Sequence, residues 1–166
     1  MRISLIIASA LFLLGTACAP AWNARAGTAD FGRLPIGAKP TDLNIFVTSD
    51  CEQSVHGFDD CSAKDAEGRE YAFFNGVLSK VSAKKAEATD HLALPANLMF
   101  GENINLSAQK VSRAFGVNLD RAPSPEGLTA YSSDFVLRSS AGVMYSIELS
   151  ADKQENLVEI VGRTDF

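Results

Sequence analysis

Alternation of apolar and polar residues predicts β-strands at several points along the chain. The pattern is clear in residues 70–74 and 77–81, which flank the dipeptide Asn75-Gly76. Asn-Gly supplies the positive backbone angles of a two-residue type I′ turn, so these segments are predicted to form a hairpin. Three further segments share the period of two and are expected to be antiparallel strands: residues 129–137, 143–149 and 157–161.

Helical spacing of apolar residues predicts one well-formed helix, capped at its start by Asn105 or Ser107 and ended by Gly116. Its apolar face is expected to hold four residues: Leu106, Val111, Ala114 and Phe115. Residues 41–47 begin with a plausible helix cap but are short and rich in β-branched residues, so only one or two helical turns are expected there. Residues 82–90, rich in Ala, Lys and Glu, are expected to form a polar helix or a solvated linker.

Helices beside runs of antiparallel strands predict an α+β fold, with short helices packed on one face of an antiparallel sheet. A Leu-x-x-Gly motif occurs at residues 34–37 and again at 98–101, each time ahead of strand patterns. We therefore expect a single domain over 34–166, made of two repeat-like halves at 34–81 and 98–161. The other face of the sheet must be solvated or covered by a partner.

The first residues have the pattern of a secretory signal peptide. Arg2 precedes an apolar run at residues 5–14, which is too short for a membrane span of about 20 residues. Residues 1–21 are expected to be removed, with cleavage after Ala21; Ala24-Arg25-Ala26 offers small residues for a second cleavage site. Residues 22–33 are expected to be an exposed N-terminal segment. The mature protein is then periplasmic or secreted.

The three cysteines fit an exported chain. Residues 14–18 end in Cys18 and resemble the lipobox of bacterial lipoproteins, so lipidation of Cys18 and anchoring to the outer membrane is an alternative route. Either route leaves Cys51 and Cys61 as a pair, which is expected to form a disulfide contributing about 3 kcal/mol. The competing interpretation, a metal pair with His56, supplies too few ligands.

Charge disfavours nucleic acid and anionic lipid as partners of the chain as a whole. The formal net charge is −5, from 15 Lys and Arg against 20 Asp and Glu. Contact with a membrane is therefore expected only through lipidated Cys18.

Residue patterns for catalysis or metal binding are weak. No Gly-x-Ser-x-Gly motif is present, and His56 and His91 are the only histidines. Asp59, Asp60 and Asp65 do not have the spacing of a calcium loop and are more simply interpreted as a solvated turn. We expect no catalytic residue, metal or cofactor; an enzyme would need a pocket around one of the histidines.

Aromatic residues on the predicted strands are candidates for a binding surface. Neighbouring strand residues point to opposite faces, so one ring of Phe73 and Phe74 must leave the core face. Aromatic side chains are enriched at protein interfaces. The candidate binding residues are Tyr71, Phe73, Phe74, Tyr131 and Tyr145. Shelter of the outer ring by residues 82–90 is the alternative.

The order of features resembles the β-lactamase inhibitory protein family and related small envelope proteins, including the small lipoprotein of the outer-membrane assembly machinery. The likeness rests on both Leu-x-x-Gly motifs, the pair Cys51 and Cys61, and the strands at Tyr71 and Phe135. It implies an exported protein that binds an envelope or secreted protein across a sheet face without chemistry. The alternatives are an inhibitor of a secreted or periplasmic hydrolase and a small enzyme.

Overall fold

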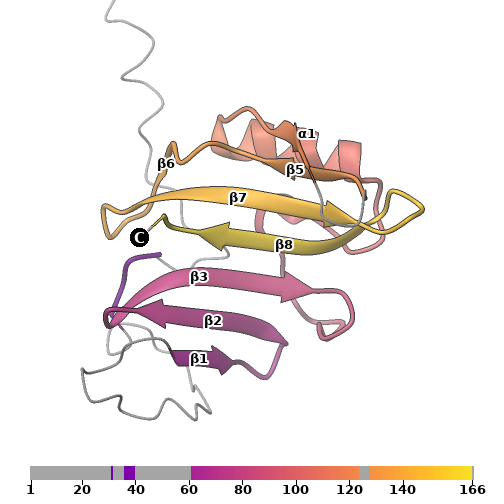
Figure 1. Cartoon of the computed structure of the whole chain (residues 1–166). Coiled ribbons are helices and arrows are strands. Elements are labelled where there is room, and N and C mark those ends of the chain that lie inside the picture. Colours follow the sequence, from indigo (N-terminus) through magenta and orange to yellow (C-terminus); the bar gives the residue numbers. More distant parts are fainter. Residues whose placement is uncertain (1–30, 32–35, 40–60, 124–127, 166) are drawn as a thin grey trace, which may run out of the picture.

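A computed structural model describes residues 31, 36–39, 61–123 and 128–165 of the chain. These residues form one antiparallel sheet of eight strands with one α-helix (Figure 1). The α+β prediction is confirmed only in its coarse form, because the sheet predominates and one α-helix stands where several short helices were expected. Residues 1–30 and 41–47, with Cys51, lie outside the described residues, so the signal peptide, the first helix and the disulfide stay predictions.

The sheet combines strands from both predicted halves. Its strands are β1 (Cys61–Lys64), β2 (Arg69–Phe74), β3 (Val77–Lys84), β4 (Asp120–Ala122), β5 (Ala130–Ser132), β6 (Leu137–Arg138), β7 (Met144–Ala151) and β8 (Leu157–Arg163). They are ordered β1-β2-β3-β8-β7-β5-β4, and β6 pairs with β7. The C-terminal strand β8 therefore joins the β1–β3 meander to the rest of the sheet.

The β2–β3 hairpin confirms the strongest local prediction. Asn75 and Gly76 have φ values of 50° and 72°, as a type I′ turn requires. A bulge between Ala72 and Phe73 shifts the register near the turn. β3 then continues to Lys84, so the prediction of a helix or linker beginning at residue 82 was wrong for its first three residues.

The predicted strand at residues 129–137 is two strands, β5 and β6, with an irregular segment between them. Within that segment the Ser133 hydroxyl accepts from the backbone N–H of Ile147 at 2.9 Å, and the N–H of Val136 donates to the Asp134 carbonyl at 2.8 Å. The Ser133 hydroxyl thus takes the place of a backbone carbonyl in pairing with Ile147. Regular pairing with β7 stops at this point and resumes at Leu137.

Helix α1 (Ile104–Phe115) ends at Gly116 as predicted, in the left-handed conformation at φ 67°. It begins earlier than predicted, because Asn103 is the cap and its side-chain oxygen accepts from the Asn105 N–H at 3.0 Å. Leu106 is 48% exposed and Ala114 is also exposed, so the predicted apolar face was wrong at these two positions. The residues that α1 buries are Ile104, Ser107, Ala108 and Val111.

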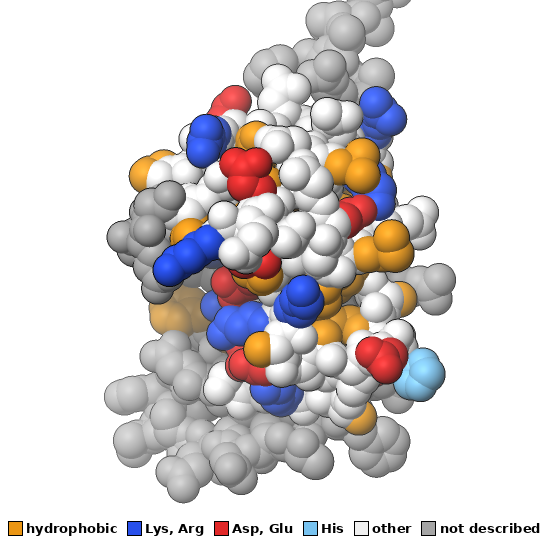
Figure 2. Space-filling view, turned by 90° about the vertical axis from the view of Figure 1, so that its right-hand side faces the viewer, with side chains coloured by type: hydrophobic (Ala, Val, Ile, Leu, Met, Phe, Trp, Pro, Cys, Tyr) orange, Lys and Arg blue, Asp and Glu red, His pale blue; other side chains and the backbone are white. Residues whose placement is uncertain are grey.

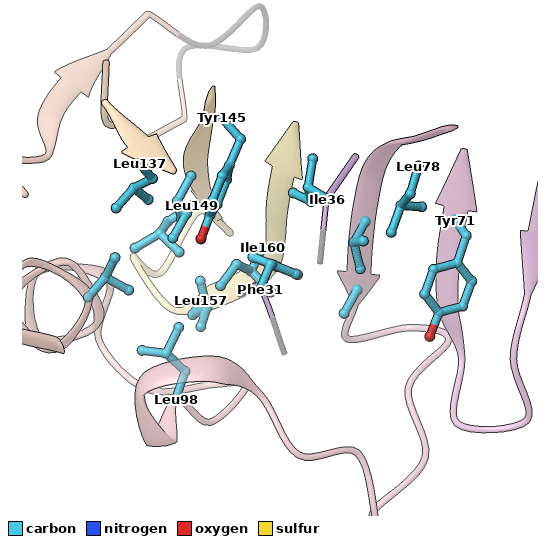
Figure 3. Packing of buried hydrophobic residues seen from close by; sticks show 14 of the residues in the cluster. Phe31, Ile36, Tyr71, Leu78, Leu98, Leu137, Tyr145, Leu149, Leu157 and Ile160 are labelled. Atoms are coloured by element: carbon cyan, nitrogen blue, oxygen red, sulfur yellow. The ribbon is translucent and has the colours of Figure 1, made fainter. Parts of the chain in front are cut away.

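One face of the sheet carries the core. Tyr145, Ile147 and Leu149 of β7 are fully buried on this face, and α1 and the 3₁₀ turn η3 (Pro95–Asn97) lie over it. Figure 3 shows buried side chains from separate strands converging beside Leu98 and Leu157. A second layer therefore covers this face.

Two residues from the start of the chain complete this core. Phe31 is 2% exposed and Ile36 fully buried (Figure 3). A Cβ on Gly162 would lie 2.8 Å from the Phe31 ring and 3.1 Å from Ile36 Cδ1, so the glycine allows both side chains to approach β8. The prediction of an exposed segment at residues 22–33 was wrong at Phe31.

Hydrogen bonds connect residues 36–38 to β3 on one side and to the β6–β7 turn on the other. The Gly37 N–H donates to the Leu78 carbonyl at 2.7 Å, and the Leu78 N–H donates to the Ala38 carbonyl at 2.8 Å. On the other side, the Ser139 hydroxyl donates to the carbonyl of Ile36. The segment thus lies between the start of β3 and the β6–β7 turn.

Candidate binding surface

A continuous row of paired residues crosses the face of the sheet that lies opposite the core. Cross-strand partners share a face, so the register of successive pairs defines this row. From edge to edge it contains Lys64, Glu70, Ser82, Val161, Glu148, Ser132 and Asp120. We call the face that carries this row the open face, because the described helices lie on the other side (Figure 1).

Small side chains form the middle of the open face. Ser82, Val161 and Ser146 are at most 7% exposed, although no described helix covers them. Beside these residues, Arg163 and Glu148 form an ion pair at 2.6 Å, and the Ser82 hydroxyl donates to Glu70 Oε2 at 3.5 Å. Among the described residues, the Ser146 hydroxyl is the one buried side-chain polar group without a hydrogen-bond partner.

Charges of both signs surround this middle. Lys84 pairs with Glu70 at 3.6 Å, and Lys64 pairs with Glu87 beyond the end of β3. The hydrogen bond from Lys64 lowers the pKa of Glu87, and the same contact raises the pKa of Lys64. Ion pairs this exposed contribute little to stability, and they give the face a defined pattern of charge.

Most of the predicted aromatic binding residues belong to the core instead. Tyr71 is 1% exposed, Phe73 is 3% exposed and Tyr145 is fully buried, so a partner cannot contact them on the folded surface. Phe74 is 37% exposed on the open face, which confirms that one ring of the Phe73-Phe74 pair leaves the core. Tyr131 pairs with Leu149 on the core face.

The two tyrosines at the sheet margins use their hydroxyl groups structurally. Tyr131 donates to the Asn105 side-chain oxygen at 2.6 Å and so ties β5 to the first turn of α1. Tyr71 donates to Asp65 Oδ2 at 2.5 Å, and burial followed by this hydrogen bond raises the pKa of Tyr71 well above its usual value. Asp65 Oδ1 accepts from the backbone N–H groups of Glu67 and Arg69, both at 2.9 Å. Asp65 thus organises the β1–β2 turn.

Candidate chemistry is sparse among the described residues. His91 is exposed in a loop, whereas His56, Asp59 and Asp60 lie outside the described part. Within that part, no three His, Cys, Asp or Glu side chains are grouped to hold a metal ion. No described helix is long and apolar enough to cross a membrane.

Sequence reasoning missed the polar residues that make up most of the open face. The signal was present, because Glu70, Ser82 and Glu148 occupy the polar positions of the same period-two patterns that placed the aromatics. The aromatic positions of these patterns mostly face the core, so candidates chosen for their aromatic side chains are mostly core residues. No family model, curated protein or solved structure matches the chain in comparisons of its sequence and fold.

Proposed function

We propose that this chain is an exported, non-enzymatic protein of the bacterial cell envelope that binds a protein partner through the open face. The observation that carries the proposal is the one-sided covering of the sheet: among the described residues, α1, η3 and the core lie on one face only. An antiparallel sheet tolerates water on its second face, so that face is available for a partner.

The dimensions of the open face suit a protein. Seven strands lie side by side in the main path of the sheet, and a spacing of about 4.8 Å gives a width of about 30 Å. Three rows of outward residues about 7 Å apart bring the flat area to roughly 600 Å², near the roughly 800 Å² that each partner buries in a standard interface.

Paired charges around that centre favour specificity over general adhesion. A partner must carry complementary charges at both ion pairs, Lys84–Glu70 and Arg163–Glu148. A partner cation placed against Lys84 or Arg163, or an anion placed against Glu70 or Glu148, would weaken the complex by repulsion. Phe74 supplies an exposed aromatic at one corner of the face.

Site-specific photocrosslinking tests the binding face. A photoreactive phenylalanine analogue at Lys80 or Ser150 is on the open face, and the same analogue at Gln109 or Arg113 is on the exposed side of α1. In cells that make the protein natively, both open-face positions are expected to crosslink the same envelope protein. Crosslinks from the α1 positions alone would contradict the proposal.

Intact mass of the protein from the same cells tests export. A chain beginning near Trp22, or a lipidated chain beginning at Cys18, is expected. A full-length chain recovered from the cytoplasm would refute the envelope location.

A further inference from the structure

Exposed apolar side chains gather at one end of the sheet. Four of the six large hydrophobic residues that are exposed in the described part are there: Phe74, Phe135, Val136 and Met144. Phe74 precedes the β2–β3 turn, Met144 follows the β6–β7 turn, and Phe135 and Val136 are in the loop before β6. These three connections belong to separate parts of the sequence.

Contacts with residues 36–38 place the connections together. Leu78, just after the β2–β3 turn, is hydrogen-bonded to Gly37 and Ala38, and a Cβ on Gly37 would lie 2.3 Å from the Val143 side chain in the β6–β7 turn. The pair of Leu137 with Tyr145 and the hydrogen bonds of Ser133 with Ile147 place the 133–136 loop alongside the first half of β7, next to this end. In Figure 1 this end is on the left, where β7 begins and the C-terminus lies. We call it the apolar end.

The charge of the apolar end differs from that of the chain. Among the described residues around it, cations outside ion pairs outnumber anions, although the net charge of the whole sequence is −5. The cations are Lys39, Lys80 and Arg138, and the anions are Asp134 and Asp165. Arg163 is also at this end, but its charge is paired with that of Glu148. The opposite end, seen in Figure 2, has acidic and basic side chains interspersed with hydrophobic ones.

We propose that the apolar end binds the surface of an anionic lipid bilayer. Apolar side chains on neighbouring loops can enter the boundary between headgroups and acyl chains, while surrounding Lys and Arg side chains attract anionic headgroups. The proposal rests on the proposed function only for the envelope location. Phe74, Lys80 and Arg163 belong to both surfaces, whereas Ser150 of the open face is near the other end of β7, so a protein partner can be tested there separately.

The same end receives the N-terminal part of the chain. Residues 36–38 lie among its turns, and Phe31 packs only a few residues upstream. A lipid on Cys18 would be joined to Phe31 by residues 19–30, which span at most about 40 Å when extended. Such a tether would hold the apolar end towards the bilayer.

Vesicle flotation tests the proposal with the processed protein. Vesicles of phosphatidylcholine alone are compared with vesicles containing phosphatidylglycerol, and binding is expected to increase with the anionic lipid and to decrease with salt. The double variant Phe135→Ser/Val136→Ser should lower the partition coefficient by about tenfold or more, because it removes two apolar groups from the bilayer boundary.

The chain supplies a matched control. Met99 and Leu106 are 64% and 48% exposed away from the apolar end, so Met99→Ser/Leu106→Ser changes exposed apolar area without changing that end. This variant should float like the unsubstituted protein. Because all variants share one N-terminus, binding through that terminus alone would leave both double variants unaffected and would overturn the proposal.

Two other results would also overturn it. One is absence of flotation with either vesicle; the other is an equal loss in both double variants. Circular dichroism confirms that each variant is folded before flotation. Crosslinking from the open face is a separate measurement, so loss of vesicle binding with that crosslinking retained would reject the lipid surface and leave the proposed function standing.

Discussion

Substitution of Gly162 by alanine tests whether the first part of the chain is packed on the central strand β8. The added Cβ would lie 2.8 Å and 2.9 Å from two atoms of the Phe31 ring and 3.1 Å from Ile36 Cδ1. Contacts shorter than 3.0 Å require the ring or the strand to move. The backbone of Gly162 itself does not need a positive φ, so the expected cost arises from packing.

The magnitude follows from core substitutions of known type. Overpacking by one methyl group costs about 1–3 kcal/mol, and removal of a buried phenylalanine side chain costs about 3–5 kcal/mol. In the double variant Gly162→Ala/Phe31→Ala the new methyl enters space that the ring has left. Its free energy of unfolding should therefore exceed the additive expectation by about 1–3 kcal/mol.

Urea unfolding followed by circular dichroism provides the four free energies of this double-mutant cycle. Phe74→Ala is the control, because Phe74 is on the open face and its cycle with Gly162→Ala should be additive within about 0.5 kcal/mol. Additivity of the Phe31 cycle, or an unchanged midpoint for Gly162→Ala, would refute the packing of Phe31 against β8.

Two further substitutions test local features. Tyr71→Phe removes the hydrogen bond to Asp65 and should lower the free energy of unfolding by about 1–3 kcal/mol in the same assay. Burial raises the pKa of Tyr71, so the unfolded state loses the phenol proton at a lower pH than the folded state does. The free energy of unfolding should therefore fall as the pH rises above about 10. Tyr71→Phe should weaken this pH dependence, and an unchanged profile would contradict the assignment. Gly76→Ala should cost about 1 kcal/mol from strain alone, because φ is 72° and no atom lies within 4 Å of the new Cβ; a neutral result would argue against the type I′ turn.

Local sequence was enough to predict the elements whose conformation is determined by neighbouring residues. Asn75-Gly76 determines its own turn, and Gly116 ends α1 without help from distant residues. The division of 129–137 into β5 and β6 depends instead on the contact between Ser133 and Ile147, which no local pattern contains. The length of β3 likewise depends on pairing with β8.

The sequence predicted which strand residues share a face of the sheet, but it did not predict which of the two faces becomes the core. The sequence indicated that Phe73 and Phe74 point to opposite faces, but α1 and Phe31 determine which face becomes the core. Tyr71 and Tyr145 are on that face and are therefore buried. The unpaired cations of the apolar end come from residues 39, 80 and 138, which are far apart in the sequence, so their grouping is visible only in the folded chain.

The position of β8 has a consequence for the order in which the chain can fold. This strand is the last of the described strands in sequence order, yet it lies between β3 and β7 and pairs with both. While the chain emerges from a ribosome, the β1–β3 meander and β7 are present before the strand that connects them. A nascent chain therefore lacks the completed sheet until residues 157–163 have been synthesised and can pair with both strands.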